Sequence, residues 1–322
     1  MPDIHVPNAE PKVSVLMLTY NHEKFIAQAI KSVLMQKTDF PFELVIGEDC
    51  STDGTREIVR EYSQKYPEIV RAHLQERNIG AQENSRLIFM APRGRYLATL
   101  DGDDYWTDSR KLQLLADVLD AHPETAICGH RTIRHDEDGA QPDEIIEKLP
   151  AGFYDLEAMP PRCFLHTSSV MFRRVIPPEW CRRLLMSDLP LFVEVARHGN
   201  ICYLDECMAV YRIHGGGIWN GIDDIERSRS GLPLYQAYYD NLEPKYRPAI
   251  RKGWRNVVFG VGLAEFDAGR PDQTRQSLRE YRGLCGPFEG LPQKALLALK
   301  GYGWWIYPFW RQARRLWRRQ KA

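Results

Sequence analysis

The feature that most constrains the fold is a repeated succession of an apolar run, a polar loop and a segment with helical spacing. Residues 13–18 (VSVLML) are almost continuously apolar, which is the pattern of a strand buried on both faces of a parallel sheet. A polar turn follows, and from Glu23 onward the apolar positions have helical spacing, with Asn21 well placed to cap the helix. The same succession returns over residues 42–66. We therefore predict an α/β fold in which a mostly parallel sheet is flanked by helices, with a ligand site beyond the carboxyl ends of the strands.

The alternation continues to about residue 218 and then stops. Further strands are expected at 69–74, from 96 onward, and at 126–128, 168–172, 202–204 and 208–211. Further helices are expected at 82–90, 111–119 and 190–198, and an acidic, polar loop at 136–150. Beyond 219 helices dominate, at 232–241, 249–269, 274–284, 293–299 and 309–320. The sequence thus predicts an α/β domain over residues 1–218 and a helical C-terminal extension over residues 219–322.

An acidic turn lies at the end of one predicted strand. The apolar segment that begins at Tyr96 leads directly into Asp101, Asp103 and Asp104. Carboxylates this close repel one another, so such a cluster usually persists because a cation lies between its members, and a hard divalent metal with oxygen ligands is the obvious candidate. The alternative is a solvated turn that caps the helix beginning near Ser109; the position at a strand's carboxyl end favours the metal.

A second polar loop, residues 47–54 (GEDCSTDG), follows the second predicted strand. It partly matches an EF-hand calcium loop, but the twelfth position is Arg60 and a strand precedes it, so that interpretation fails. We interpret Glu48 and Asp49 as acceptors for a nucleoside's base or ribose. Ser51 and Asp53 are expected mainly to hold the turn and cap the next helix.

Composition excludes several classes of protein. The formal net charge is zero, which gives no electrostatic case for nucleic acid, and the seven cysteines contain no Cys-x-x-Cys pair that would indicate a zinc site or a disulfide framework. No signal peptide or long apolar segment is present, which favours a cytoplasmic protein. After Glu289 the chain has no acidic residue and a net charge of +8, interleaved with aromatics. This tail is expected either to contact an anionic membrane surface, as at the cytoplasmic face of the inner membrane, or to be an ordinary helix packed on the α/β domain.

Four segments together resemble the family 2 glycosyltransferases: VSVLMLTYN, EDCSTDGT, RNIG and LDGDDYW, in that order within residues 12–217. The resemblance implies the GT-A nucleotide-sugar-binding fold. It places Thr19, Tyr20, Asn21, Glu48, Asp49 and Asp101 around the nucleotide, and the Asp101-Gly102-Asp103 signature, with Asp104 beside it, at a Mg or Mn ion and the diphosphate. Glu48 and Cys50 depart from the commonest pattern, which has Asp and Gly there.

Three further residues take their expected roles from the same resemblance. Asp188 matches the position of the acidic residue that acts as base on the acceptor; taken alone, an Asp before an apolar helix is more often an N-cap. Arg212 and His214 lie on one face of a strand before three glycines. Arg212 is expected to contact the diphosphate and His214 to complete the metal shell, although ordering the loop is an alternative role. Residues 166–169 resemble the acceptor-side wall.

The function expected from these features is inverting, metal-dependent transfer of a sugar from a nucleoside-diphosphate donor to a hydroxyl of a glycan or lipid-linked acceptor, as in cell-surface polysaccharide synthesis. A sugar nucleotidyltransferase is one alternative, but such enzymes usually carry a Gly-rich basic loop where this chain has TYNHE. A non-catalytic nucleotide-sugar-binding module is another. A P-loop enzyme is excluded because the Gly-x-x-x-x-Gly-Lys-Ser/Thr motif is absent.

Overall fold

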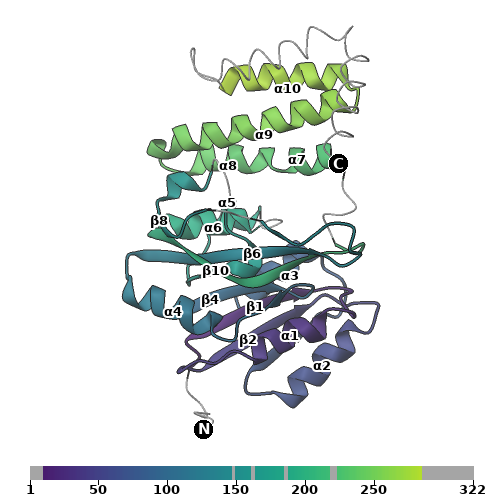
Figure 1. Cartoon of the computed structure of the whole chain (residues 1–322), viewed down its shortest axis with the longest axis vertical. Helices are drawn as coiled ribbons and strands as arrows, with labels where there is room; N and C mark the ends of the chain where they lie inside the picture. Colours follow the sequence, from purple (N-terminus) through teal and green to yellow (C-terminus); the bar gives the residue numbers. More distant parts are fainter. Residues whose placement is uncertain (1–9, 147–148, 161–163, 185–187, 218–222, 285–322) are drawn as a thin grey trace. The chain divides into compact units, whose positions relative to one another are not determined.

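The computed structural model describes residues 10–146, 149–160, 164–184, 188–217 and 223–284 (Figure 1). These residues belong to two compact units. The first unit contains residues 10–159 and 164–217, and the second contains Pro160 and residues 223–284. The predicted helices at 293–299 and 309–320, and with them the basic aromatic tail, lie outside the described residues.

The first unit is built on one ten-stranded sheet with flanking helices, so the predicted α/β fold is confirmed. Its strands are β1 (Val13–Thr19), β2 (Phe42–Glu48), β3 (Val70–Leu74), β4 (Tyr96–Asp101), β5 (Tyr105–Trp106), β6 (Thr125–Asp136), β7 (Glu144–Ile145), β8 (Gly152–Tyr154), β9 (Met171–Arg173) and β10 (Asn200–Ile213). The order along the sheet is β3-β2-β1-β4-β9-β6-β10-β5, with β7 paired to β6 and β8 to β10. Strands β3, β2, β1 and β4 are mutually parallel, so the loops that follow them meet at one edge.

The second half of the sheet is mixed and contains the main differences from the sequence-based expectation. Strand β9 runs antiparallel between β4 and β6, whereas β6 and β10 are parallel to each other. Residues 202–204 and 208–211 belong to one long strand, β10, because register shifts accommodate the polar residues between them. Part of the expected loop at 136–150 forms β7.

Helices cover both faces of the sheet, as expected for strands that are apolar on both sides. They are α1 (Ile26–Leu34), α2 (Thr55–Lys65), α3 (Ala81–Phe89), α4 (Lys111–Ala121), α5 (Glu179–Arg182) and α6 (Leu189–Ala196). Buried side chains of α1, α2 and α4 share one hydrophobic cluster with β1, β2 and β4 (Figure 1). On the opposite face, Phe172 of β9 packs against Phe89 of α3 and Phe192 of α6.

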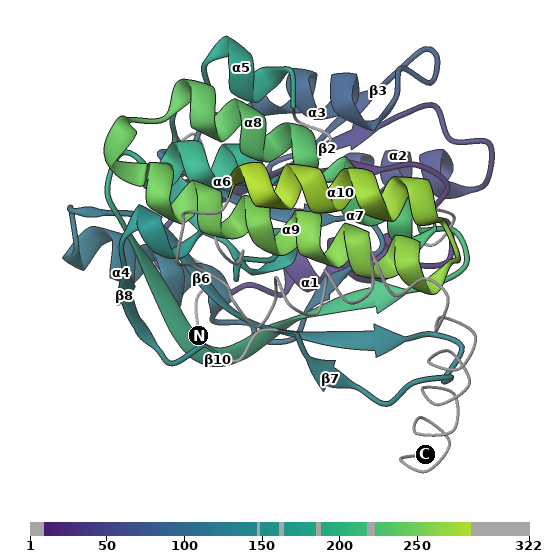
Figure 2. The same cartoon turned by 90° about the horizontal axis from the view of Figure 1, so that it is seen from above.

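The second unit is helical, with α7 (Asp224–Ser230), α8 (Leu232–Asn241), α9 (Arg247–Asp267) and α10 (Pro271–Leu284). Helices α9 and α10 run side by side (Figure 2), and Val258, Leu278 and Tyr281 form the centre of their contact. Buried Glu265 joins the helices by accepting hydrogen bonds from Arg229 and Ser277. Among the described residues, no helix is both long enough and apolar enough to cross a membrane.

Candidate active site

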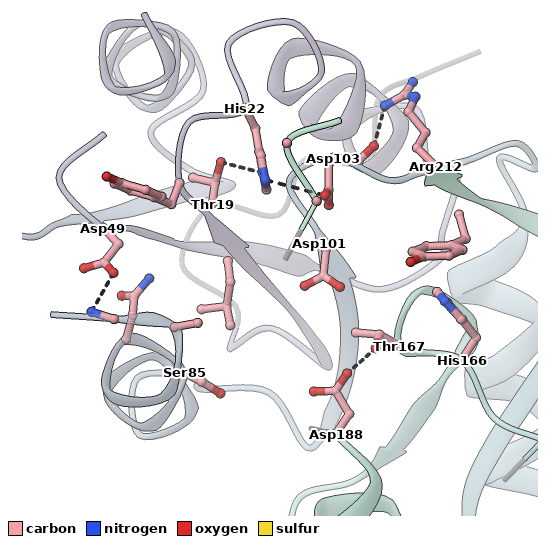
Figure 3. A pocket seen from close by; sticks show the side chains of 18 of the residues that line it. Thr19, His22, Asp49, Ser85, Asp101, Asp103, His166, Thr167, Asp188 and Arg212 are labelled. Carbon is pink, nitrogen blue, oxygen red and sulfur yellow. Dashed lines mark hydrogen bonds and ion pairs between the residues drawn. The ribbon is translucent and has the colours of Figure 1, made fainter. Parts of the chain in front are cut away.

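A cavity of about 490 Å³ lies in the first unit, at the carboxyl ends of β1 and β4 (Figure 3). Its wall includes Thr19 at the end of β1, Asp101 at the end of β4, and residues of the loops that follow these strands. This is the edge where ligands bind to parallel α/β sheets. Of the predicted site residues, the structure brings nine to the cavity wall: Thr19, Tyr20, Asp49, Asp101, Asp103, His166, Thr167, Asp188 and Arg212.

At one end of the cavity, Asp49 is held by the backbone of the segment before α3. Its two carboxylate oxygens accept hydrogen bonds from the amides of Ile79 (2.8 Å) and Gly80 (2.9 Å). Tyr20 lies on the same wall with 39 % of its surface exposed. Gly80 has φ of 85°, a left-handed conformation that favours glycine, which explains the glycine of the RNIG segment.

Glu48 and Asn21 are absent from the cavity wall, which corrects their predicted positions. Glu48 is fully buried and accepts hydrogen bonds from the Ser51 amide (2.6 Å) and from Arg56 (2.7 Å). Asn21 has φ of 56°, and its side chain accepts a hydrogen bond from the Thr52 amide (2.8 Å). The expected cap role of Asn21 is also wrong, because α1 begins only at Ile26. Asn21 thus links the loop after β1 to the loop after β2, whereas Glu48 fixes the loop after β2 to α2.

The other residues of the second loop have the structural roles expected of them. Asp53 accepts hydrogen bonds from the amide of Thr55, at the start of α2, and from the amide of Glu23. Ser51 accepts one from the Asn21 amide through its hydroxyl. The loop after β1 is thus fixed to the loop after β2.

Asp103 lies between two histidines. Its Oδ2 is 3.1 Å from Nε2 of His214 and 3.5 Å from Nε2 of His22, whose Nδ1 in turn is 3.3 Å from the Thr19 hydroxyl. Burial acts to raise the pKa of Asp103, but the hydrogen bond to His214 and the nearby His22 outweigh it and leave this pKa lowered. Asp103 is therefore an ionised acceptor inside the cavity (Figure 3).

Asp101 is in a different electrostatic environment from Asp103. Burial raises the pKa of Asp101 well above its ordinary value, and the neighbouring carboxylates of Asp188 and Asp103 raise it further. Within the described part of the chain, no hydrogen-bond donor is found for its side chain. In Figure 3 it lies between Asp103 and Asp188. This is a carboxylate that becomes stable in its ionised form once a cation is bound beside it.

Asp104, predicted as a metal ligand, faces away from the cavity. It is 1 % exposed, and its Oδ1 accepts a hydrogen bond from the Arg212 amide at 2.9 Å. Burial, followed by repulsion from Asp103 and Asp101, raises the pKa of Asp104 well above its ordinary value. Its observed role is to attach the end of β10 to the acidic turn.

Arg212 lines the cavity beside this turn. Its guanidinium donates to the Asp103 carbonyl and to Gln28, each at 2.6 Å, lies 2.5 Å from Glu137, and stacks over the Tyr105 ring. It is the only arginine or lysine among the described residues that line the cavity. Four aspartates share that wall, so a diphosphate would meet a surface in which negative charge predominates.

The side chains of the cavity fit a divalent cation whose other ligands would be water and the phosphates of a bound substrate. No set of three or more Cys, His, Asp or Glu side chains in the described ranges converges as a complete protein metal site. Mg²⁺ and similar ions in phosphate-transfer sites are commonly bound through one or two carboxylates, with water and substrate phosphates completing the shell. Asp101 and Asp103 offer two such carboxylates, and His214 contacts Asp103.

Another part of the cavity wall contains Asp188 and Thr167, the first residue of the 3₁₀ turn η2 (Thr167–Ser169). Asp188 accepts a hydrogen bond from the Thr167 hydroxyl. Burial raises the pKa of Asp188, and the Thr167 hydrogen bond opposes this shift. Burial also lowers the pKa of His166 to about 4, so its imidazole, which packs against the Tyr211 ring at 4.7 Å, is neutral.

Sequence reasoning missed several residues of the wall. His22 follows the first strand in TYNHE, and its position at the edge where the other loops meet was a usable signal. Asn84 and Ser85 of α3 and Tyr211 of β10 had no such signal, because they reach the wall only through the packing of α3 and the course of β10. Asn84 is fixed there by donating to the Gly47 carbonyl at 2.9 Å.

Comparison with known proteins agrees with this geometry. Residues 14–177 match glycosyl transferase family 2. An uncharacterized Mycobacterium tuberculosis protein is 38 % identical over 218 residues, covering 65 % of this chain and 60 % of the relative. A putative teichuronic acid biosynthesis glycosyltransferase of Bacillus subtilis is 29 % identical over 66 % of this chain and 82 % of its own length. The chain thus spans about 60 % of the length of its mycobacterial relatives.

Two solved structures share the fold. TarS 1–349 of Staphylococcus aureus in complex with UDP has a TM-score of 0.57 at 19 % identity, covering 84 % of this chain and 91 % of that one. A mannosyltransferase of Pyrobaculum calidifontis in complex with GDP-Man and Mn²⁺ has a TM-score of 0.57 at 17 % identity, covering 95 % and 84 %. The family match, which covers half of the chain, and the GT-A-like sheet lead to one conclusion: this chain belongs to glycosyl transferase family 2.

Proposed function

We propose that this chain is a glycosyltransferase that inverts the anomeric centre in a single displacement, with a nucleoside-diphosphate sugar as donor, a divalent Mg or Mn ion as cofactor and Asp188 as base. The observation that carries the proposal is the arrangement of the four aspartates in the cavity. Asp49 lies apart from the other three, and Asp101 lies between Asp103 and Asp188 (Figure 3).

The chain's own residues supply most of the chemistry in this proposal. Asp49 and Tyr20 hold the nucleoside, and Arg212 holds the diphosphate. An acceptor hydroxyl attacks the anomeric carbon; the new carbon–oxygen bond forms as the bond to the diphosphate oxygen breaks. The hydroxyl proton passes to Asp188, and the diphosphate leaves with the bonding electron pair. Proton removal by a positioned base contributes on the order of 10²- to 10⁴-fold in rate.

The divalent ion would be held by Asp101 and Asp103, with His214 beside them. Bound there with the diphosphate, it supplies positive charge that stabilises the leaving group. His214 and His22 keep Asp103 ionised and oriented. Asp104 is not included in this shell, for the reason given above.

We further propose an acceptor and a cellular setting for the reaction. The similarity to a putative teichuronic acid enzyme supports a hydroxyl of a cell-surface glycan or of a lipid-linked precursor as acceptor. We also propose a cytoplasmic location at the membrane surface, an extension beginning near residue 219, and membrane contact through the C-terminal tail, which lies outside the described residues. A sugar nucleotidyltransferase is not retained, because the chain belongs to a glycosyltransferase family.

The experiment is a panel of UDP-, GDP- and dTDP-sugars, with release of nucleoside diphosphate measured in Mn²⁺, in Mg²⁺ and in EDTA. Turnover of one donor that stops in EDTA supports the proposal. Metal-independent turnover would contradict the cofactor assignment. Donor binding without turnover in the presence of candidate acceptors would favour the non-catalytic module.

A further inference from the structure

Asp188 occupies a capping position without capping. It is the N-cap residue of α6, yet its side chain accepts no hydrogen bond from the helix backbone. An Asp at this position normally accepts from the amide of the second or third helical residue, which satisfies one of the open donors there. The carboxylate of Asp188 therefore has a role other than capping the N-terminus of α6.

The sequence of α6 removes one competing donor. Pro190 is the second residue of the helix and has no amide hydrogen. Of the two backbone amides that usually compete for an N-cap carboxylate, only that of Leu191 remains. A proline here keeps the helix geometry while it makes capping by Asp188 less favourable.

One oxygen of Asp188 is instead fixed by the turn η2. The Thr167 hydroxyl donates to Oδ2 of Asp188 (Figure 3). For Oδ1, the described part of the chain provides no donor. A carboxylate held through one oxygen presents the other in a fixed direction, and here both Asp188 and Thr167 line the cavity.

The turn η2 is itself anchored to the strand that carries the acidic signature. Thr99 of β4, two residues before Asp101, donates to the Thr167 carbonyl at 2.6 Å. Trp106, which ends the acidic segment, donates from Nε1 to the Ser168 carbonyl at 2.8 Å and is 1 % exposed. The position of Thr167 is therefore set by both ends of the segment that carries Asp101 and Asp103.

We propose that Thr167 is the positioning residue for the base: its hydroxyl holds Oδ2 of Asp188, so that Oδ1 is the atom that takes the proton of the acceptor hydroxyl. This inference rests on the proposed role of Asp188. In the transfer step the acceptor O–H proton moves to Oδ1, the acceptor oxygen bonds to the anomeric carbon, and the nucleoside diphosphate departs. Thr99 and Trp106 fix the geometry between the base and the donor's leaving group.

The test compares Thr167→Val, which keeps the shape but removes the hydroxyl, with Thr167→Ser, which keeps the hydroxyl. Thr38→Val is the matched control, because Thr38 donates to the Phe40 carbonyl in the segment before β2, at the opposite edge of the sheet. Nucleoside diphosphate release from the donor found in the panel is measured at saturation, and donor affinity is measured by calorimetry. Because hydrogen bonds to charged groups are the stronger class, we expect Thr167→Val to lower kcat by about 10- to 100-fold and leave donor affinity within about threefold. Thr167→Ser and Thr38→Val are expected to stay near the wild type.

Two further variants keep the inference open to refutation. Trp106→Phe removes the Nε1–H donor that anchors η2, and kcat is expected to fall by roughly 3- to 10-fold, again without a change in donor affinity. If Thr167→Val does not fold, Trp106→Phe provides the test instead. Equal losses in the Val and Ser variants, or an unchanged kcat in Thr167→Val, would overturn the role of Thr167. Asp188→Asn separates the role of Asp188 as base from the role of Thr167 in positioning it. If Asp188→Asn retains the wild-type kcat, the base assignment fails. If Asp188→Asn is inactive while Thr167→Val is unimpaired, only the positioning role of Thr167 is refuted.

Discussion

Asp104 provides a sharp test of the site, because the family resemblance and the structure assign it different roles. The resemblance predicts a metal ligand. In the structure, Asp104 is buried, its Oδ1 accepts the Arg212 amide hydrogen, and its Oδ2 has no partner among the described residues. The perturbations are Asp104→Asn, which keeps an acceptor oxygen in place, and Asp104→Ala, which removes it.

The two changes have different expected costs. Asp104→Ala leaves the buried Arg212 amide without an acceptor, which costs about 1–3 kcal/mol, and the small cavity adds about 1 kcal/mol. A loss of about 2–4 kcal/mol corresponds to a fall in Tm of roughly 4–16 °C for a domain of this size class. Asp104→Asn keeps the acceptor and buries no charge, so near the ordinary carboxyl pKa of about 3.9 its free energy of unfolding is expected to change by less than about 1 kcal/mol.

The effect of Asp104→Asn on the free energy of unfolding is expected to depend on pH, and the raised pKa of Asp104 gives its sign. The pKa of Asp104 is raised in the folded protein, so above the ordinary carboxyl pKa the unfolded chain ionises while the folded chain retains the proton. The wild-type carboxyl therefore costs stability as pH rises from that value toward its folded pKa. The Asn variant removes this cost, and its stability relative to the wild type is expected to increase over the same range.

The assay is thermal unfolding in EDTA from pH 4 to 8, followed by calorimetric titration of the donor in Mn²⁺. Asp103→Asn serves as the comparison, with an expected loss of about 10- to 100-fold in metal-dependent donor affinity. Asp104→Asn is expected to bind donor within about threefold of the wild type. If Asp104→Asn loses as much metal-dependent donor affinity as Asp103→Asn, the structural role of Asp104 is wrong, and Asp104 is a metal ligand as the family resemblance implies.

Two further predictions follow from the same geometry. Because burial raises the pKa of Asp188, kcat/KM is expected to fall with decreasing pH at values above the ordinary aspartate pKa of about 3.9. In Thr167→Val, which lacks the hydrogen bond that opposes this shift, the fall in kcat/KM is expected at higher pH. A pH–rate profile whose acid limb is not shifted in the variant would contradict the assignment of Asp188 as base. Gly102→Ala would place a Cβ 2.6 Å from Oγ1 of Thr19 and 3.0 Å from Nδ1 of His22, so we expect weaker donor binding and a stability loss of about 1–3 kcal/mol. Gly260 of α9, which has open space around it, provides the control: Gly260→Ala is expected to be neutral or slightly stabilising in the same unfolding and binding assays.

The parallel half of the fold was predictable because its strands are buried on both faces and therefore read as continuous apolar runs. Strands β1, β2 and β4 were expected within two residues of their observed ends. β10 was harder to predict, because polar residues at its register shifts divide it into two short runs. The antiparallel insertion of β9 depends on pairing between distant segments, which no local pattern reports.

The site was predictable by segment but not by side chain. Adjacent residues at a strand end or in a tight turn point in different directions, so of Glu48 and Asp49, and of Asp103 and Asp104, only one of each pair lines the cavity. The segments that resemble the family contain both members of each pair and do not say which one faces the ligand. The pairing of Thr167 with Asp188 joins residues 21 positions apart and depends on the tertiary fold.

The central claim is that Asp188 removes the acceptor proton, and the most direct measurement compares kcat and donor affinity in Asp188→Asn. Asp39→Asn is the matched control, because Asp39 is an exposed aspartate before β2, at the opposite edge of the sheet. The account predicts that Asp188→Asn lowers kcat by on the order of 10²- to 10⁴-fold while donor affinity stays within about threefold, and that Asp39→Asn changes neither. A kcat for Asp188→Asn within about threefold of the wild type would contradict the account.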